Sequence, residues 1–294
     1  MRSIQIGGTA VAVREIWEGT PVVLLHCTGS SGNQWRGIAD ALLSGPLAVN
    51  RDGRGYRLIM PDLRGYGESE PWSGRGPMRL VDDAAIVRAL ADEAGEPVHL
   101  VGHSYGGAVA LMAALHTPEA LSSLTLIEPA AFFLLRGGSA SDHALFVEIA
   151  SVGERIAKGL VNGEYRAAME HFVDYWSGAG AWRSMAPQAH DMLCRRIAAI
   201  ALNFATTTGE KTPLEAAGRL KLPTLLLHGT RTKPIARRIV ERLMWTLPNA
   251  TLRTVEGAGH MLPLTHPSPV AYAVGDHVTG RENAVVQFLE RCAA

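Results

Sequence analysis

The turn at residues 102–107, Gly-His-Ser-Tyr-Gly-Gly, constrains the fold of this chain more than any other feature. It follows a short apolar run at residues 97–101 and precedes a helix-like segment at residues 108–116. The glycines allow the backbone to turn sharply from a strand into a helix without a steric clash. Ser104, at the centre of such a turn, is raised from the end of a sheet. The pattern therefore predicts a strand–turn–helix unit within an α/β sheet.

Further short apolar runs continue this alternation of strands and helices. Two apolar segments flank Gly7-Gly8-Thr9 and predict an opening hairpin. Runs typical of buried parallel strands follow, with helical patterns between them. These strands are expected at residues 22–25, 57–60, 98–101, 121–127, 224–227 and 251–255, and the helices at residues 33–43, 81–90 and 235–247.

Residues 131–220 depart from this alternation. They carry amphipathic helical patterns and no run typical of a buried strand. We therefore expect a core domain formed by residues 1–130 and 221–294, interrupted by a helical cap at residues 131–220. A length of 294 residues with 47% hydrophobic content is enough for one core with such an insertion.

Composition narrows the class of partner. The 28 basic residues balance the 28 acidic ones, so no nucleic-acid partner is indicated and a small molecule is expected. The N-terminus lacks the apolar core of a signal peptide, and no apolar run approaches the roughly 20 residues that cross a bilayer. We expect a cytoplasmic protein without a membrane partner, and the sequence does not define its oligomeric state. Cys27, Cys194 and Cys292 are widely spaced and are expected to be reduced thiols.

Four motifs occur in an order that resembles the α/β-hydrolase fold family over nearly the whole chain. Besides the turn at residues 102–107, they are His26-Cys27-Thr28-Gly29, the segment 62–69 with the sequence Asp-Leu-Arg-Gly-Tyr-Gly-Glu-Ser, and Gly257-Ala258-Gly259-His260. The resemblance implies an α/β fold with a mostly parallel sheet of the eight-stranded type, helices on both faces and an inserted helical cap. It also implies that the turn around Ser104 is a nucleophile elbow.

The residues and the resemblance together indicate a serine nucleophile with a histidine base. A serine hydroxyl is a poor nucleophile at neutral pH, so it needs a base within hydrogen-bond reach. His260 follows the last predicted strand in a glycine-rich loop, where the family carries its base. His266 is the nearest alternative, but Thr265-His266-Pro267 is typical of the start of a final helix. Ser104 and His260 are therefore the predicted nucleophile and base.

The acid that would orient this base is missing from its usual place. In the family an aspartate commonly follows the strand predicted at residues 224–227, and this chain has Thr232 there. Glu128 ends the neighbouring apolar run, at the strand end where many haloalkane dehalogenases carry their acid. A glutamate is seldom placed at the end of a buried strand without a partner. We therefore predict Glu128 as the acid, with Glu256 as the alternative. We expect Thr232→Ala to leave kcat nearly unchanged.

The resemblance also implies an oxyanion hole. Its donors would be the backbone N–H groups of Tyr105, directly after the nucleophile, and Thr28, two residues after His26. Cys27 replaces the glycine that is usual in this loop. Because its side chain adds bulk and disfavours positive φ, the loop is expected to take a slightly different path near Thr28.

Substrate selection is expected to come from the cap. Several apolar aromatic side chains are candidates for lining a pocket above Ser104, namely Phe132, Phe133, Phe146, Trp176 and Trp182. Together they favour a small to medium, mostly apolar substrate. In the core, Asp62 is interpreted as a loop-bracing carboxylate and Arg64 as an arginine that satisfies backbone carbonyls.

These features predict a serine hydrolase that cleaves a carboxylic ester or related acyl bond through an acyl-enzyme, without a metal or an organic cofactor. A carbon–carbon bond hydrolase and a cofactor-free haloperoxidase or perhydrolase resemble the chain in the same residues. A ligand-binding protein on a hydrolase scaffold is the alternative from another class, because the usual acid is missing. Haloalkane dehalogenase and epoxide hydrolase chemistry is disfavoured, since those enzymes use an aspartate nucleophile where this chain has Ser104.

Overall fold

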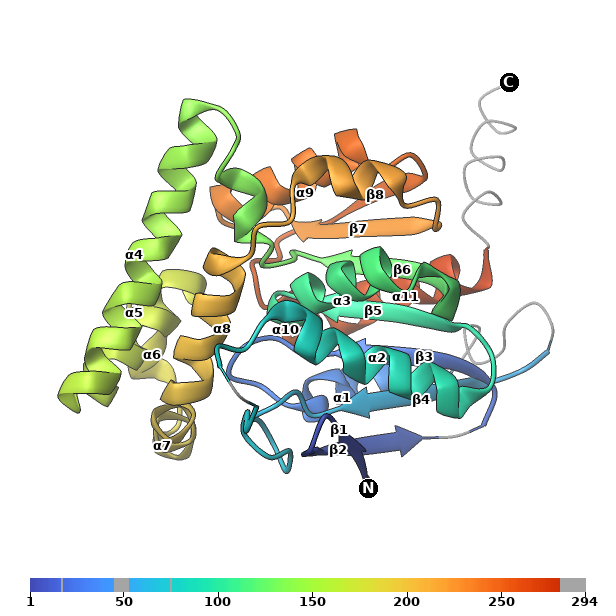
Figure 1. Cartoon of the computed structure of the whole chain (residues 1–294), viewed down its shortest axis with the longest axis horizontal. Helices are drawn as coiled ribbons and strands as arrows, with labels where there is room; N and C mark the ends of the chain where they lie inside the picture. The colour runs from blue at the N-terminus through green and yellow to red at the C-terminus, as the bar shows by residue number, and fades with distance from the viewer. Residues whose placement is uncertain (17, 45–52, 75, 281–294) are drawn as a thin grey trace.

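An eight-stranded sheet forms the centre of the molecule (Figure 1). The computed structural model describes residues 1–16, 18–44, 53–74 and 76–280, so Cys292 and the end of the predicted core domain lie outside the described residues. The strand order is β1-β2-β4-β3-β5-β6-β7-β8. The strands are β1 (Arg2–Ile6), β2 (Thr9–Ile16), β3 (Thr20–Leu25), β4 (Tyr56–Pro61), β5 (Val98–His103), β6 (Leu121–Ile127), β7 (Thr224–Gly229) and β8 (Ala250–Val255).

The sheet is mostly parallel. Strand β2 pairs antiparallel with β1 and with β4, and every other neighbouring pair is parallel. This confirms the fold class and the predicted opening hairpin. Parallel strands end at the same edge of a sheet, so the residues that follow β3, β5, β6, β7 and β8 come together there.

Helices cover both faces of the sheet. Along β3 the side chains alternate: Val23 and Leu25 lie in one buried cluster, and Val22 and Leu24 lie in the other. The first cluster packs under α2 (Leu80–Ala94), α3 (Tyr105–His116) and α9 (Pro234–Thr246). The second packs under α1 (Arg36–Leu42) and α11 (Pro267–Thr279). A strand buried on both faces is apolar throughout, which explains why these strands are continuous apolar runs in the sequence.

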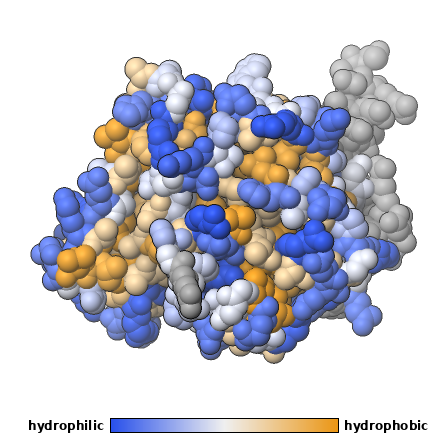
Figure 2. Space-filling view, viewed as in Figure 1, coloured by the Kyte–Doolittle hydropathy of each residue, from blue (hydrophilic) through white to orange (hydrophobic). Residues whose placement is uncertain are grey.

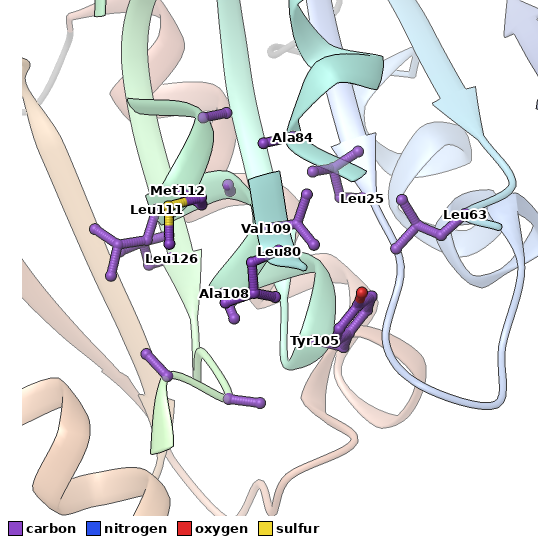
Figure 3. Close-up of a cluster of buried hydrophobic side chains, with 14 of the residues drawn as sticks. Leu25, Leu63, Leu80, Ala84, Tyr105, Ala108, Val109, Leu111, Met112 and Leu126 are labelled. Carbon is purple, nitrogen blue, oxygen red and sulfur yellow. The ribbon is translucent and has the colours of Figure 1, made fainter. Parts of the chain in front are cut away.

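Helix α3 is buried on nearly all sides. Val109, Leu111 and Met112 point from it into the cluster that also holds Leu25 of β3 and Leu126 of β6 (Figure 3). Each of these side chains is at most 1% exposed. Burying a leucine or valine of this kind contributes about 1.5–3 kcal/mol. The turn that precedes α3 therefore rests on a rigid base.

Five helices group at the end of the sheet toward which the arrows of β4 and β7 point (Figure 1). They lie between β6 and β7 in the chain, and this part of the described structure contains no strand. They are α4 (Ala140–Asn162), α5 (Tyr165–Ser177), α6 (Ala181–Ser184), α7 (Pro187–Arg195) and α8 (Ile197–Gly209), flanked by the 3-10 turns η4 (Phe132–Leu135) and η5 (Leu214–Arg219). We refer to α4–α8 as the helical layer. It covers the carboxyl ends of the parallel strands.

The surface mixes polar and apolar residues. Figure 2 shows hydrophilic residues spread over the viewed face, with smaller hydrophobic areas between them. Among the described residues, no helix combines the length and the apolar character that crossing a bilayer requires.

Candidate active site

Ser104 lies at the tip of a sharp turn between β5 and α3. Its φ of 53° and ψ of −116° are rare for a residue with a side chain. The turn depends on the glycines around it, because a Cβ on Gly102 would lie 2.3 Å from the carbonyl oxygen of Gly106. A Cβ on Gly106 would lie equally close, at 2.3 Å, to the carbonyl oxygen of Leu25. The glycines in the motif therefore have a steric cause, as the sequence predicts.

His260 lies within hydrogen-bond reach of Ser104. It belongs to the loop between β8 and α10 (Leu262–Thr265), and its Nε2 is 3.0 Å from Ser104 Oγ. Both side chains are buried. A histidine in this position can remove the hydroxyl proton as the serine attacks an electrophile.

Glu128 is the acidic partner of this histidine. Its Oε2 is 2.7 Å from His260 Nδ1. Two more donors hold the carboxylate, since the Gly229 N–H donates to Oε1 at 2.9 Å and the Thr232 hydroxyl donates to Oε2 at 2.5 Å. Burial opposes the charged form, but the hydrogen bonds from His260, Thr232 and Gly229 outweigh it and lower the pKa of Glu128. The carboxylate is therefore ionised and ready to pair with an imidazolium.

Glu128 follows β6 and Thr232 follows β7, and the two side chains meet at these neighbouring strand ends. Thr232, at the position where an aspartate is usual, contacts Glu128 directly instead of His260. Glu256, the alternative acid, is exposed and accepts a hydrogen bond from Thr230 at 3.3 Å. His266, the alternative base, is the N-cap residue of α11, and its Nδ1 lies 2.8 Å from Thr265 Oγ1.

The loop after β3 is held beside this group. His26 donates through Nδ1 to the Cys27 carbonyl at 2.8 Å and accepts through Nε2 from the Leu63 N–H at 2.9 Å, which defines a neutral ring. Burial lowers the pKa of His26 to about 4, so the ring stays neutral at pH 7. The Cys27 N–H donates to Gln34 Oε1 at 3.1 Å. The Cys27 thiol is buried, which raises its pKa to about 12 and keeps it protonated.

Two backbone N–H groups remain free next to Ser104. Tyr105 is the first residue of α3, so its N–H has no acceptor within the helix. Neither this group nor the Thr28 N–H donates to another described residue. Both residues line the same cavity as Ser104 and His260. They are suited to receive a negatively charged oxygen.

Asp62 and Arg64 brace loops, as the sequence predicts. Asp62 accepts from the N–H groups of Gly32 and Glu68 at 2.7 and 3.0 Å. Arg64 donates to the carbonyls of Asp82 and Ile6, and it also forms a buried ion pair of 2.9 Å with Asp83. These contacts occupy the side chains away from Ser104.

A cavity of about 630 Å³ opens over Ser104 and His260, between the strand ends and the helical layer. Of the aromatic residues predicted to line it, Phe132 and Trp176 do so. The other three lie elsewhere. Phe133 is buried in the core, Phe146 contacts the Arg136 guanidinium 5.0 Å from its ring centre, and Trp182 stacks on His190. Helical periodicity identifies the apolar face of a helix but not whether that face meets a cavity or another helix.

Arg196 and Asn203 line the cavity and are among the polar residues that the sequence prediction did not include. Arg196, between α7 and α8, donates through Nη1 to the carbonyls of Gly29 and Ser30, each at 3.0 Å. Within the described part of the chain it forms no ion pair, and burial lowers its pKa. Asn203 of α8 accepts through Oδ1 from the hydroxyl of Thr28 at 3.1 Å. No local pattern marks these residues, because their roles come from the packing of α8 against the loop after β3.

His103 holds the loop of the base from below. Its Nε2–H donates to the His260 carbonyl at 2.8 Å, and the two rings are 5.1 Å apart. Its Nδ1 is buried and has no hydrogen-bond partner among the described residues. Burial, reinforced by the nearby His260, lowers the pKa of His103 to about 3. His103 is therefore a neutral support for the loop.

The fold and the site together define a class of protein. A family model described as the alpha/beta hydrolase fold matches residues 20–267. The chain belongs to this family and is a hydrolase. The family resemblance seen in the sequence motifs is confirmed.

Named relatives match most of the chain. It is 27% identical over 273 residues to a 2-hydroxy-6-oxononadienedioate/2-hydroxy-6-oxononatrienedioate hydrolase from Paraburkholderia phymatum, covering 88% of each chain. It is 26% identical over 265 residues to a pimeloyl-[acyl-carrier protein] methyl ester esterase from Aeromonas hydrophila, covering 88% of this chain and 95% of the relative. Among solved structures, an esterase from Exiguobacterium antarcticum shares the fold, with a TM-score of 0.71, 20% identity, and coverage of 94% and 98% of the two chains.

Proposed function

We propose that this chain hydrolyses a carboxylic ester or related acyl bond of a small to medium, mostly apolar substrate through Ser104, His260 and Glu128. The observation that carries the proposal is the continuous hydrogen-bond chain from Ser104 Oγ through the imidazole to Glu128. Ser104 and His260 line the cavity. The named relatives include an ester hydrolase, which is consistent with this chemistry.

Acylation follows from the geometry. Ser104 Oγ attacks the carbonyl carbon while His260 Nε2 takes the hydroxyl proton, and the Nδ1–H bond to Glu128 stabilises the resulting imidazolium. The carbonyl oxygen becomes an oxyanion, which accepts from the N–H groups of Tyr105 and Thr28. When the tetrahedral intermediate collapses, the imidazolium protonates the departing alkoxide. The products are an alcohol and an acyl-enzyme.

Deacylation repeats these steps with water. His260 takes a proton from a water molecule, whose oxygen attacks the acyl carbon, and the imidazolium then returns the proton to Ser104 Oγ. The carboxylic acid leaves and the serine hydroxyl is restored. Every proton is transferred through Nε2 of His260. The Nδ1–H group must therefore stay hydrogen-bonded to the Glu128 carboxylate throughout the cycle.

The helical segment at residues 131–220 is proposed to act as the cap that selects the substrate. Its contributions to the cavity wall are mainly apolar, including Phe132, Phe172 and Phe204. Such a wall favours an apolar acyl or alcohol group through its buried area. The polar residues that this segment contributes to the cavity are Ser177, Arg196, Asn203 and Thr207.

A second candidate function is hydrolysis of a carbon–carbon bond. Arg196 faces the cavity without a carboxylate partner among the described residues, and a substrate carboxylate would complete its charge pairing. The Paraburkholderia phymatum relative is named for hydrolysis of a dioate. This candidate uses the same serine, base and acid and differs in the bond that is broken.

Covalent labelling and a substrate panel test the proposal. A fluorophosphonate probe should label the native chain and fail to label Ser104→Ala, whereas Ser151→Ala, which alters an exposed serine of α4, should label normally. The panel would compare short and medium p-nitrophenyl esters, lactones, a vinylogous 1,5-diketone acid, and hydrogen peroxide with a halogenation substrate.

Ester turnover that is lost in Ser104→Ala would support the main proposal. Turnover of the diketone acid alone would favour the carbon–carbon hydrolase, and peroxide-dependent halogenation alone would favour a perhydrolase. Absence of both labelling and turnover would overturn the proposal in favour of a ligand-binding protein.

A further inference from the structure

The indole of Trp176 lies flat against the imidazole of His260. The ring centres are 4.1 Å apart and the planes are inclined by 24°. Trp176 comes from α5 of the helical layer, while His260 comes from the loop after β8. Both ring nitrogens of His260 are already used, by Ser104 and Glu128. The face of the ring is what remains for another group to contact.

Other aromatic side chains hold the indole in place. Phe132 stacks on Trp176 with centres 6.3 Å apart, and Tyr175 meets it edge-on at 5.1 Å. Tyr175 is itself fixed at both ends, because its hydroxyl donates to Glu148 of α4 at 2.7 Å and the ammonium of Lys233 lies 4.1 Å from its ring centre. The indole is therefore supported from α4, α5 and η4 and from the start of α9.

Lys233 connects this support to the acid. It directly follows Thr232, whose hydroxyl donates to Glu128. The loop between β7 and α9 thus contacts Glu128 through one residue and the aromatic group around Trp176 through the next. The same loop therefore contacts the carboxylate at Nδ1 directly and reaches the indole on the ring face through Tyr175.

An indole face attracts a cation but not a neutral imidazole to the same degree. His260 becomes an imidazolium when it accepts the proton of Ser104. We propose that Trp176 is a positioning residue for the base, which fixes the plane of the His260 ring and stabilises its charged form from the helical layer. This inference rests on the proposed serine hydrolase function. It makes the geometry of the base depend on α5 as well as on the core.

The charged and titratable groups around His260 are few. Glu128 and His103 face it from the sheet, Arg196 lies on the same cavity, and Glu148 and Lys233 lie behind Trp176 next to Tyr175. The pKa of Glu128 is below its usual range, that of His103 is about 3, and burial raises the pKa of Tyr175 above its usual range. None of these three titrates near pH 6.5, where an imidazole ordinarily does. A change in the acid side of the pH–rate profile would therefore not arise from these three groups.

Substituting Trp176 by phenylalanine and by leucine separates stacking from space filling. For Trp176→Leu we expect kcat to fall about threefold to tenfold and the acid-side midpoint of kcat/KM to move roughly half to one pH unit lower, because the imidazolium loses its aromatic partner. Trp176→Phe retains a ring and should lie between this variant and the native protein. Trp245→Leu is the matched control, since Trp245 of α9 is 88% exposed and should leave the profile unchanged.

Two outcomes would overturn the inference. Equal losses of kcat in both variants with an unmoved midpoint would show that the indole only fills space. A midpoint that moves to higher pH in Trp176→Leu would show that exclusion of water, and not stacking, is what the indole contributes.

Proton NMR of histidine-labelled protein tests the contact without any substrate. The ring protons of His260 should lie upfield in the native chain and return downfield in Trp176→Leu, while Trp245→Leu leaves them in place. Unchanged His260 signals in Trp176→Leu would refute the stacking itself. If the upfield signals are present but Ser104→Ala retains full hydrolysis, the proposed function fails while the contact stands, so the two failures are distinguishable.

Discussion

Two of the described residues other than glycine have a positive φ, and both belong to the candidate site. Ser104 has a φ of 53° and Glu128 a φ of 42°. Glu128 also precedes Pro129, a position that ordinarily favours extended backbone. Such conformations cost on the order of 1–3 kcal/mol each and persist where surrounding contacts fix them. Here the three hydrogen bonds to the Glu128 carboxylate offset the cost and aim it at His260.

Glu128→Gln tests the acid. An amide keeps the size of the side chain but cannot stabilise an imidazolium by charge, and it can hold the wrong tautomer of His260. We expect kcat to fall on the order of 10³- to 10⁴-fold, as for the loss of the acid in other serine triads. Steady-state kinetics with the best ester of the panel would measure this, and circular dichroism would check the fold. Glu256→Gln is the matched control, and a larger loss in that variant would move the acid to Glu256.

Thr232→Val tests the hydroxyl that occupies the usual place of the acid. The sequence suggests that a change here leaves kcat nearly unchanged. The hydrogen bond of 2.5 Å to Glu128 adds an expected effect on stability. Valine keeps the shape and removes a donor to a buried carboxylate, so the free energy of unfolding at pH 7 should fall by about 1–3 kcal/mol. Thr232→Ser keeps the donor and should lose much less. Equal urea midpoints for the two variants would contradict this role.

At the scale of elements, one carboxylate ties the helical layer to the core. Asp142 in the first turn of α4 is 1% exposed. It pairs with Arg238 and Arg242 of α9, with nitrogen–oxygen distances of 2.5 Å in each case. It also accepts from the Ser139 N–H at 2.9 Å, as part of a capping box. Hydrogen bonding to Arg238 is the main reason that the pKa of Asp142 is lowered.

Asp142→Asn and Ser139→Ala together distinguish the contribution of the ion pairs to stability from that of the helix cap. Asparagine can still accept from Ser139 but leaves Arg242 without its carboxylate and Arg238 with Glu241 alone, 3.5 Å away, so the free energy of unfolding should fall by about 2–4 kcal/mol. Ser139→Ala removes the capping hydroxyl alone and should cost about 1 kcal/mol. Urea denaturation at pH 7 compares the two. A smaller loss for Asp142→Asn than for Ser139→Ala would show that the cap, not the ion pairs, holds α4.

The elements differ in how far the sequence predicts them. Strands such as β3 and β7 are apolar on both faces, so each shows a run of four consecutive apolar residues in the sequence. Their positions could therefore be predicted. Glu128 could be predicted because it ends such a strand and Thr232 cannot act as an acid. Two contacts could not be predicted: the stacking of Trp176 on His260, and the hydrogen bonds that Arg196 donates to the loop after β3. Both depend on how α5, α7 and α8 pack over the sheet. Amphipathic periodicity gives the apolar face of each helix but not its neighbour.

At the scale of the whole molecule, buried neutral histidines support the loops on which the site is built. His26 fixes the loop after β3, and His103 fixes the loop that carries His260. Both are fully buried. Each ring accepts or donates in its neutral form, and neither forms an ion pair with a carboxylate of the described residues. The site therefore depends on two groups that resist protonation only while the chain is folded.

This arrangement predicts that the folded state loses stability as the pH falls below about 6.5. An unfolded histidine binds a proton near that pH, whereas burial lowers the pKa to about 4 for His26 and about 3 for His103 in the folded chain. Between these limits the unfolded state holds more protons, so the free energy of unfolding decreases by about 1.4 kcal/mol per pH unit for each histidine, or about 3 kcal/mol for the pair. The lowered pKa of Glu128 adds its loss only at more acidic pH, below the ordinary range of a glutamate.

Urea denaturation at half-unit steps between pH 7 and pH 5 would measure this slope. His103→Gln can still donate to the His260 carbonyl but cannot be protonated, so it should reduce the slope by about 1.4 kcal/mol per pH unit while lowering stability at pH 7 through the altered packing. His143→Gln, a change at a more exposed histidine of α4, should leave the slope unchanged. A stability that stays level from pH 7 to pH 5, or a slope that is unaltered in His103→Gln, would show that these rings are not the groups that couple folding to protons.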